Sequence, residues 1–285
     1  TLLVVSIRLR LDLSYDGSEF SGWAVQPNRR TVQGGVELAL SRVFHCELHQ
    51  LRTVVAGRTD AGVHATGQVC HADLPDEAEA VVTRAGSGDR LLKRLRGALG
   101  KSSPVWIRSV VRAPEGFDAR FSALSRRYEY RIADATSTKD PRQVGYTLWS
   151  DDHLDREAMN ALGHKLLGLH DWASFCRARP GATTIRELQE FSWTPDADNV
   201  LVSTVLADAF CHSMVRSLVG AAVAVGRGDL SIEQVVALRD ATTRTSSWKT
   251  MAAKGLTLCE VTYPPDRELF RRAEATRSQR EQPTD

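Results

Sequence analysis

The order of hydrophobic patterns along this 285-residue chain predicts an α+β fold made of two ferredoxin-like βαββαβ halves. Residues 6–14 alternate between apolar and polar side chains, which is typical of a half-buried strand. Apolar residues from Val32 to Phe44 recur at helical spacing behind Thr31, a residue type that caps helices. The same order of strand and helix patterns recurs after residue 125. The sequence therefore predicts two similar halves.

The first half, residues 1–120, contains each element of one βαββαβ unit. We expect further strands at 51–57, 67–73 and 105–112, and a short basic helix at 91–99. The polar stretch at 76–89 contains Gly and Ser, so we expect a linker there.

The second half, residues 121–263, repeats this order with one additional helix. Apolar patterns predict strands at 126–133, 185–193, 200–206 and 256–263, and helices at 154–169 and 211–225. Ser231 followed by Gln234 is a capping box, which predicts the extra helix. The tail, residues 264–285, is charged and poor in apolar residues, so we expect it to be disordered.

The composition is typical of a soluble protein with a substantial core. Hydrophobic residues make up 42% of the chain, and the net charge is only +2, so any affinity for nucleic acid must come from local clusters of basic residues. No apolar run reaches the ~18 residues that a membrane helix needs. The five cysteines are widely spaced and lack a C-x-x-C pair, which favours free thiols in a reducing compartment. We therefore expect a cytoplasmic protein.

One stretch, residues 54–69, combines an acid, a base and three glycines between two strand-like runs. Gly57, Gly62 and Gly67 would allow a tight turn with positive φ angles, and this turn would present Arg58 and Asp60. The stretch is not a P-loop, because Lys and Ser or Thr do not follow Gly62, and it lacks the G-x-G-x-x-G spacing of dinucleotide-binding loops.

Two interpretations of Asp60 follow from the spacing. At strand spacing Arg58 lies on the same face and would keep the carboxylate ionised, which suits a nucleophile. Alternatively, Asp60 accepts backbone N–H groups within its own turn and Arg58 forms a surface ion pair. The spacing alone favours neither.

Arg216 lies within the apolar pattern of the predicted helix 211–225. A buried guanidinium without an anion is very costly, so Arg216 should meet a carboxylate or a bound phosphate. We expect Asp60 as its partner, with a structural pair to Asp208 or Asp240 as the alternative.

Residues 126–132 read RRYEYRI, so Tyr128 and Tyr130 share one face of a strand and arginines share the other. Tyrosines at this spacing usually pack in a core, yet aromatic residues interleaved with arginines also suit base stacking. The candidates for phosphate contact are Trp23, Arg29, Arg30, Lys93, Arg94 and Arg96, although any single one of them is more typical of a solvated basic face. His64 and His71 have no metal-binding spacing, so we expect them to form hydrogen bonds and predict no metal.

Several motifs in this order resemble the TruA family of tRNA pseudouridine synthases. The central one is GRTDAGVHATGQV at 57–69. The others are YDGSEFSGW at 15–23, RTVQ at 30–33, FDARFSALSRRYEY at 117–130, LLGLHDWASF at 166–175, MVRSLVG at 214–220 and KGLTL at 254–258. The resemblance implies two α+β halves joined into one extended, mostly antiparallel sheet, with helices on one side and a catalytic cleft between the halves.

The resemblance also implies an activity, which is isomerisation of uridine to pseudouridine at positions 38, 39 and 40 of the tRNA anticodon arm. It implies a homodimer that acts on tRNA without a cofactor. Asp60 matches the nucleophile and Tyr128 the tyrosine that contacts the target uridine. Base flipping would use Arg58 as a wedge, and Arg216 would pair with Asp60. Covalent attack and a glycal route remain open.

A non-catalytic RNA-binding protein built from paired ferredoxin-like sheets is the alternative function. The two hypotheses differ in Asp60, because an RNA-binding protein would tolerate its replacement by alanine and an enzyme would not.

Overall fold

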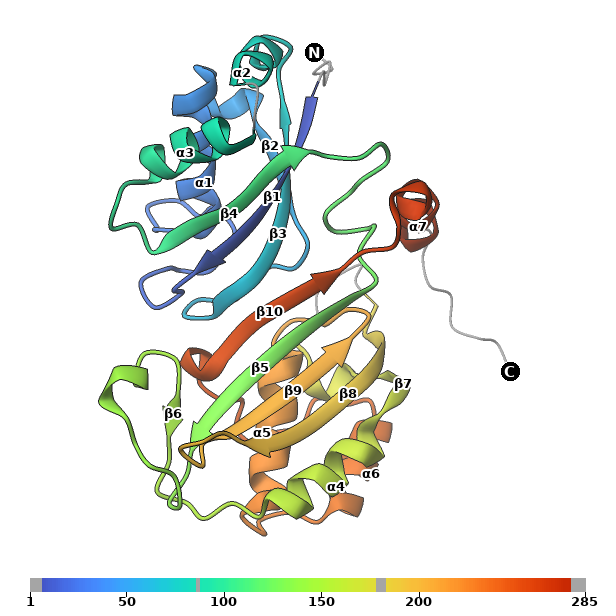
Figure 1. Cartoon of the computed structure of the whole chain (residues 1–285). Helices are drawn as coiled ribbons and strands as arrows, with labels where there is room; N and C mark the ends of the chain where they lie inside the picture. Colours follow the sequence, from blue (N-terminus) through green and yellow to red (C-terminus); the bar gives the residue numbers. More distant parts are fainter. Residues whose placement is uncertain (1–6, 86–87, 178–182, 278–285) are drawn as a thin grey trace. The chain divides into compact units, whose positions relative to one another are not determined.

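The computed structural model describes residues 7–85, 88–177 and 183–277. The chain divides into two compact units, Thr1–Leu124 together with Glu260–Asp285, and Ser125–Cys259. Figure 1 labels the helices and strands of both units. The predicted cleft between the halves stays a prediction.

Unit 1 contains a four-stranded antiparallel sheet in the order β4-β1-β3-β2. Its strands are β1 (Ile7–Tyr15), β2 (Arg52–Val55), β3 (His64–Leu74) and β4 (Val105–Arg112). Alternate residues of β1 are buried, beginning with Ile7 and ending with Tyr15, as the sequence predicted. The buried face lies under the helices of this unit, which Figure 1 shows together on one side of the sheet.

The helices of unit 1 are α1 (Val32–Phe44), α2 (Ala78–Ala85) and α3 (Gly88–Leu99), and a short 3-10 turn, η1 (Leu48–Gln50), follows α1. Thr31 caps α1 as predicted, because its side chain accepts a hydrogen bond from the Gly34 backbone N–H. The prediction of a linker at 76–89 is wrong, since α2 and the start of α3 lie there. Ala and Glu are strong helix formers, and buried Ala78 anchors the first turn of α2.

Unit 2 contains a sheet in the order β10-β5-β9-β8-β7, with the short β6 parallel to β5. The β5–β9, β9–β8 and β8–β7 pairs are antiparallel. The strands are β5 (Ser125–Ala133), β6 (Leu148–Trp149), β7 (Gly168–Asp171), β8 (Ile185–Pro195), β9 (Leu201–Ala207) and β10 (Leu256–Thr262). Both units are therefore α+β with mostly antiparallel pairing, which confirms the predicted fold class.

The helices of unit 2 are α4 (Arg156–Leu166), α5 (Met214–Gly226) and α6 (Ile232–Asp240), and the 3-10 turns are η2 (Pro141–Gln143), η3 (Ala173–Phe175) and η4 (Ala253–Gly255). The predicted capping box of Ser231 and Gln234 is confirmed at the start of α6. The predicted extension of α4 to residue 169 is wrong, because Gly168 has a φ of +106° and Leu169 enters β7 with its side chain 54% exposed. A left-handed glycine ends the helical path.

The charged tail is ordered as far as Arg277, so the prediction of disorder is wrong for 264–277, while 278–285 lie outside the described residues. It forms η5 (Asp266–Glu268) and α7 (Leu269–Arg277). Leu269 and Ala273 are buried, and the Ser122 hydroxyl donates to the Leu269 carbonyl. Arg277 lies 3.1 Å from Asp118. A few apolar contacts and these polar bonds hold a helix that its charged composition did not indicate.

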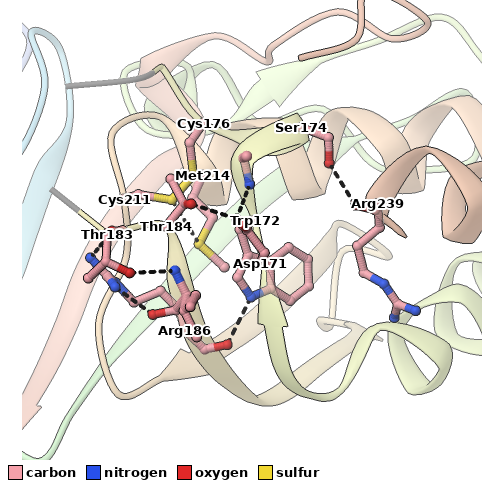
Figure 2. Close-up of a disulfide and its surroundings, with 12 residues drawn as sticks. Asp171, Trp172, Ser174, Cys176, Thr183, Thr184, Arg186, Cys211, Met214 and Arg239 are labelled. Atoms are coloured by element: carbon pink, nitrogen blue, oxygen red, sulfur yellow. Dashed lines mark hydrogen bonds between the residues drawn. A yellow bond between two sulfur atoms is a disulfide. The ribbon is translucent and has the colours of Figure 1, made fainter. Parts of the chain in front are cut away.

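A disulfide joins Cys176 and Cys211, whose Cα atoms are 5.9 Å apart (Figure 2). The prediction of free thiols is therefore wrong for this pair and correct for Cys46, Cys70 and Cys259. The two bonded cysteines are 35 residues apart, so the fold, not local spacing, brings them together. No helix within the described ranges is long and apolar enough to cross a bilayer.

Candidate active site

The loop at 57–63 leaves the end of β2 and returns as β3. The backbone N–H of Ala56 donates to Val69 at 2.9 Å, which closes the strand pair behind the loop. Asp60 is half-buried on this loop, whereas the Arg58 side chain is exposed. The predicted ion pair between Arg58 and Asp60 stays a prediction. Of the three glycines expected at positive φ, only Gly62 adopts it, at +78°.

The segment 15–23 braces this loop through backbone bonds. Trp23 N–H donates to the Thr59 carbonyl at 3.0 Å, and Gly62 N–H donates to the Phe20 carbonyl at 3.3 Å. These bonds fix the chain on both sides of Asp60. The sequence indicated a turn-rich segment at 15–23 but gave no sign that it supports residue 60.

Two glycines let the segments approach this closely. A Cβ on Gly17 would lie 2.0 Å from the Val63 carbonyl oxygen, and a Cβ on Gly22 would lie 2.9 Å from the Thr59 carbonyl oxygen. Gly22 also has a φ of +97°, which side-chain-bearing residues rarely adopt. The glycines of the YDGSEFSGW motif therefore serve close backbone packing against the Asp60 loop.

A buried side-chain network lies under the same loop. The Gln68 side-chain amide donates to the Gly57 carbonyl at 2.8 Å and to the Tyr15 hydroxyl at 3.1 Å. Because Tyr15 accepts from Gln68, its own hydrogen is available to the Thr59 hydroxyl, 2.8 Å away. Burial raises the pKa of Tyr15 to about 12. Tyr15 thus stays neutral at physiological pH and holds Thr59, the residue before Asp60.

The histidines of this region form hydrogen bonds, as predicted. His64 Nδ1 lies 3.1 Å from the Gly17 backbone N–H and His71 Nδ1 lies 3.0 Å from that of Ala119, so in each ring this nitrogen is the acceptor. No group of three or more His, Cys, Asp or Glu residues suited to a metal ion occurs in the described ranges.

In unit 2, Tyr128 lies on β5 opposite Val205 and is only 7% exposed. Its ring meets the Phe210 ring edge-on, with centroids 5.2 Å apart. Tyr130 is fully buried on the same face of the strand, and its hydroxyl donates to the Ala252 carbonyl at 2.8 Å. Of the two tyrosines, Tyr130 is the core residue and Tyr128 retains slight exposure.

Arg216 lies in the first turn of α5, because the helix begins at Met214 and not at Cys211 as predicted. Every other residue of α5 is buried, while Arg216 is half-buried. Its Nε donates to the Met251 carbonyl at 2.6 Å, and the Met251 N–H donates back to the Arg216 carbonyl. Asp240, the alternative partner, pairs instead with Arg239 at 2.8 Å. The guanidinium is therefore positioned by the 251–252 segment.

Several residues predicted to contact phosphate have structural roles. Trp23 is buried, which contradicts that prediction for its side chain. Arg30 pairs with Glu19, and Arg94 donates to the Val43 carbonyl. Arg96 bonds the Ile107 carbonyl and lies over the Trp106 ring at 4.1 Å.

Comparison with known proteins identifies the family. The sequence profile of a family described as tRNA pseudouridine synthase matches residues 163–264. A "tRNA pseudouridine synthase A" from Leifsonia xyli is 54% identical over 280 residues, covering 96% of this chain and 97% of the relative.

Two further relatives bear the same description. One from Frankia casuarinae is 51% identical, covering 98% of this chain and 97% of its own length. One from Streptomyces avermitilis is 49% identical, covering 97% and 95%. Matches of this extent include both units and the loop that carries Asp60. The chain belongs to the tRNA pseudouridine synthase A family.

Proposed function

We propose that this chain isomerises uridine to pseudouridine at positions 38, 39 and 40 of the tRNA anticodon arm, with Asp60 as its nucleophile. The reaction breaks the C1′–N1 glycosidic bond, rotates the freed base and joins C5 to C1′. The proton on C5 is lost and N1 gains one, so substrate and product are isomers and no redox cofactor is needed. Family membership supports the reaction, and the resemblance of the central motif supports the positions.

The position of Asp60 carries the proposal. Asp60 is half-buried on a loop whose backbone is bonded at Thr59 and at Gly62, so the loop is held in place while the residue keeps contact with solvent. Preorganisation of this kind is what a nucleophile requires. An ionised Asp60 serves both open routes, covalent attack and proton removal from C2′ toward a glycal.

The other residues receive roles as substrate-binding groups. A uridine in the stem or loop must leave its stack to be processed, and extrusion calls for a wedge and a stacking surface. Arg58 is exposed on the loop, which suits a wedge. Tyr128 supplies the stacking ring, and Arg216, held by Met251, supplies positive charge to the reacting site. The enzyme acts as a homodimer in the cytoplasm.

The decisive experiment measures tritium release from C5-labelled uridine in tRNA, with the modified positions mapped by primer extension. Wild type should release tritium from positions 38 to 40. Asp60→Ala and Asp60→Asn should bind tRNA with near wild-type affinity and release none. Asp76→Ala, which removes an exposed carboxylate elsewhere in unit 1, is the matched control and should keep full activity.

Two results would contradict the proposal. If wild type releases no tritium from any tRNA, the chain is not a pseudouridine synthase of this kind. If Asp60→Ala keeps wild-type turnover, Asp60 is not the nucleophile.

A further inference from the structure

A small, partly open pocket lies within unit 2, away from the Asp60 loop in sequence. Three segments form its walls: the chain after η3, the start of α5 and the segment after α6. The residues that matter here are Arg177, Ser213, Ser217, Arg244, Thr245 and Trp248.

The pocket is positively charged. Arg177 and Arg244 both line it, and no Asp or Glu does. Both side chains are exposed, and in the described part of the chain neither guanidinium has a hydrogen bond or an ion pair. Several other arginines of unit 2 form ion pairs, as Arg131 does with Asp196 at 2.5 Å. Two arginines that line one pocket without an acid favour an anionic ligand.

Hydroxyl groups complete the lining and suit the same ligand. Trp248 Nε1–H donates to Ser217 Oγ at 2.9 Å, so the Ser217 hydrogen is free to point elsewhere. Thr245 adds another hydroxyl. Ser213 immediately precedes α5, so the pocket opens at the positive end of that helix. The pocket therefore offers charged and neutral donors from three segments.

Covalent and backbone bonds fix two of the walls. The disulfide ties Cys176, next to Arg177, to Cys211 on the approach to α5 (Figure 2). The Arg177 N–H donates to the His212 carbonyl at 3.1 Å. Arg177 and the start of α5 thus have a defined separation before any ligand binds.

We propose that this pocket binds a phosphate group, and that a backbone phosphodiester of the RNA substrate supplies it. This source rests on the proposed function. A phosphodiester exposes two anionic oxygens, which two arginine forks can bind together. The exposed guanidiniums suit a phosphate that belongs to a chain passing over the surface. Arg177 and Arg244 are then positioning residues, which bind the RNA backbone at a point away from the reacting uridine.

The experiment compares tRNA affinity over a range of salt concentrations for wild type and the Arg177→Gln/Arg244→Gln double variant. Loss of two phosphate contacts should reduce the slope of log affinity against log salt by roughly 1.4 to 1.8. At 0.1 M salt this corresponds to binding about 25- to 60-fold weaker. Arg177→Lys/Arg244→Lys keeps the charges and should retain a slope near that of wild type. Arg156→Gln, which removes an exposed arginine of α4, should leave it unchanged.

A second arm distinguishes RNA from free phosphate. The melting temperatures of wild type and the double glutamine variant are compared in inorganic phosphate and in chloride at equal ionic strength. General salt effects act on both proteins, so only the difference between their phosphate-dependent shifts in melting temperature indicates binding at the pocket. A larger phosphate-dependent stabilisation of wild type, with an unchanged salt slope for tRNA, would assign the pocket to free phosphate.

The proposal is overturned if the double glutamine variant matches wild type in both arms. Pseudouridine formation by wild type is measured on the same preparations, so the two proposals fail separately. If the double glutamine variant has a smaller salt slope than wild type but wild type forms no pseudouridine, the pocket proposal stands and the proposed reaction is ruled out.

Discussion

Gly17→Ala tests whether close packing of two loops positions the nucleophile. Gly17 lies in unit 1 against the loop that carries Asp60, and its φ lies outside the left-handed region, so alanine is opposed only by space. The added Cβ would lie 2.0 Å from the Val63 carbonyl oxygen. That is 1.4 Å short of an ordinary 3.4 Å contact. Because the obstacle is backbone, no side-chain rotation relieves it.

The loop must therefore move by about the missing distance. A displacement near 1 Å at a reacting group costs on the order of 10²-fold in rate. Overpacking of this kind also destabilises a protein by about 1 to 3 kcal/mol. We expect kcat to fall at least about 10²-fold, while the affinity for tRNA stays close to that of wild type because the proposed phosphate-binding arginines are not part of this loop.

The assay is tritium release under single-turnover conditions, with tRNA affinity and thermal unfolding measured on the same protein. Gly35→Ala is the matched control, because a Cβ there meets nothing within 4 Å and the site lies inside α1. That variant should keep full activity and gain up to about 1 kcal/mol of stability.

Wild-type turnover in folded Gly17→Ala would refute the reasoning. It would mean that the loop tolerates a shift of this size, so the brace at 15–23 would not position Asp60.

Three further outcomes are expected. Truncation before Leu269 should lower the free energy of unfolding by about 2 to 4 kcal/mol because α7 is packed; equal melting temperatures of the truncated and full-length chains would contradict this. The neutral form of Tyr15 contributes stability that is complete below pH ~10 and is lost as pH rises toward 12, about 2 to 3 kcal/mol in all. The difference in free energy of unfolding between wild type and Tyr15→Phe, measured in urea, should therefore become smaller as the pH rises over that range. A constant difference would contradict the stabilising role of neutral Tyr15. Reduction of the Cys176–Cys211 disulfide should lower stability by about 4 kcal/mol, and thiol titration of the denatured chain should give three thiols before reduction and five after; five before reduction would disprove the bond.

The sequence predicted most of the fold because its signals are local. Alternation in 6–14 and helical spacing from Val32 to Phe44 depend only on which face of an element is buried, and both correspond to β1 and α1. The capping box at Ser231 is equally local, since its two partners are three residues apart. The charged composition of the tail predicted disorder, and that prediction was wrong for 264–277 because a few buried residues, such as Leu269, hold α7 in place.

The sequence by itself determined the family and the identity of the residue proposed as nucleophile, because a motif is a run of neighbouring residues. The tertiary structure alone decided how that residue is held. The bonds from Trp23 to Thr59, the Gly17 approach to Val63 and the Cys176–Cys211 pair join segments 35 to 46 residues apart. Arg177 and Arg244, which line one pocket, are 67 residues apart. Contacts at such separations depend on how strands pair and helices pack, and no pattern within a short window specifies them.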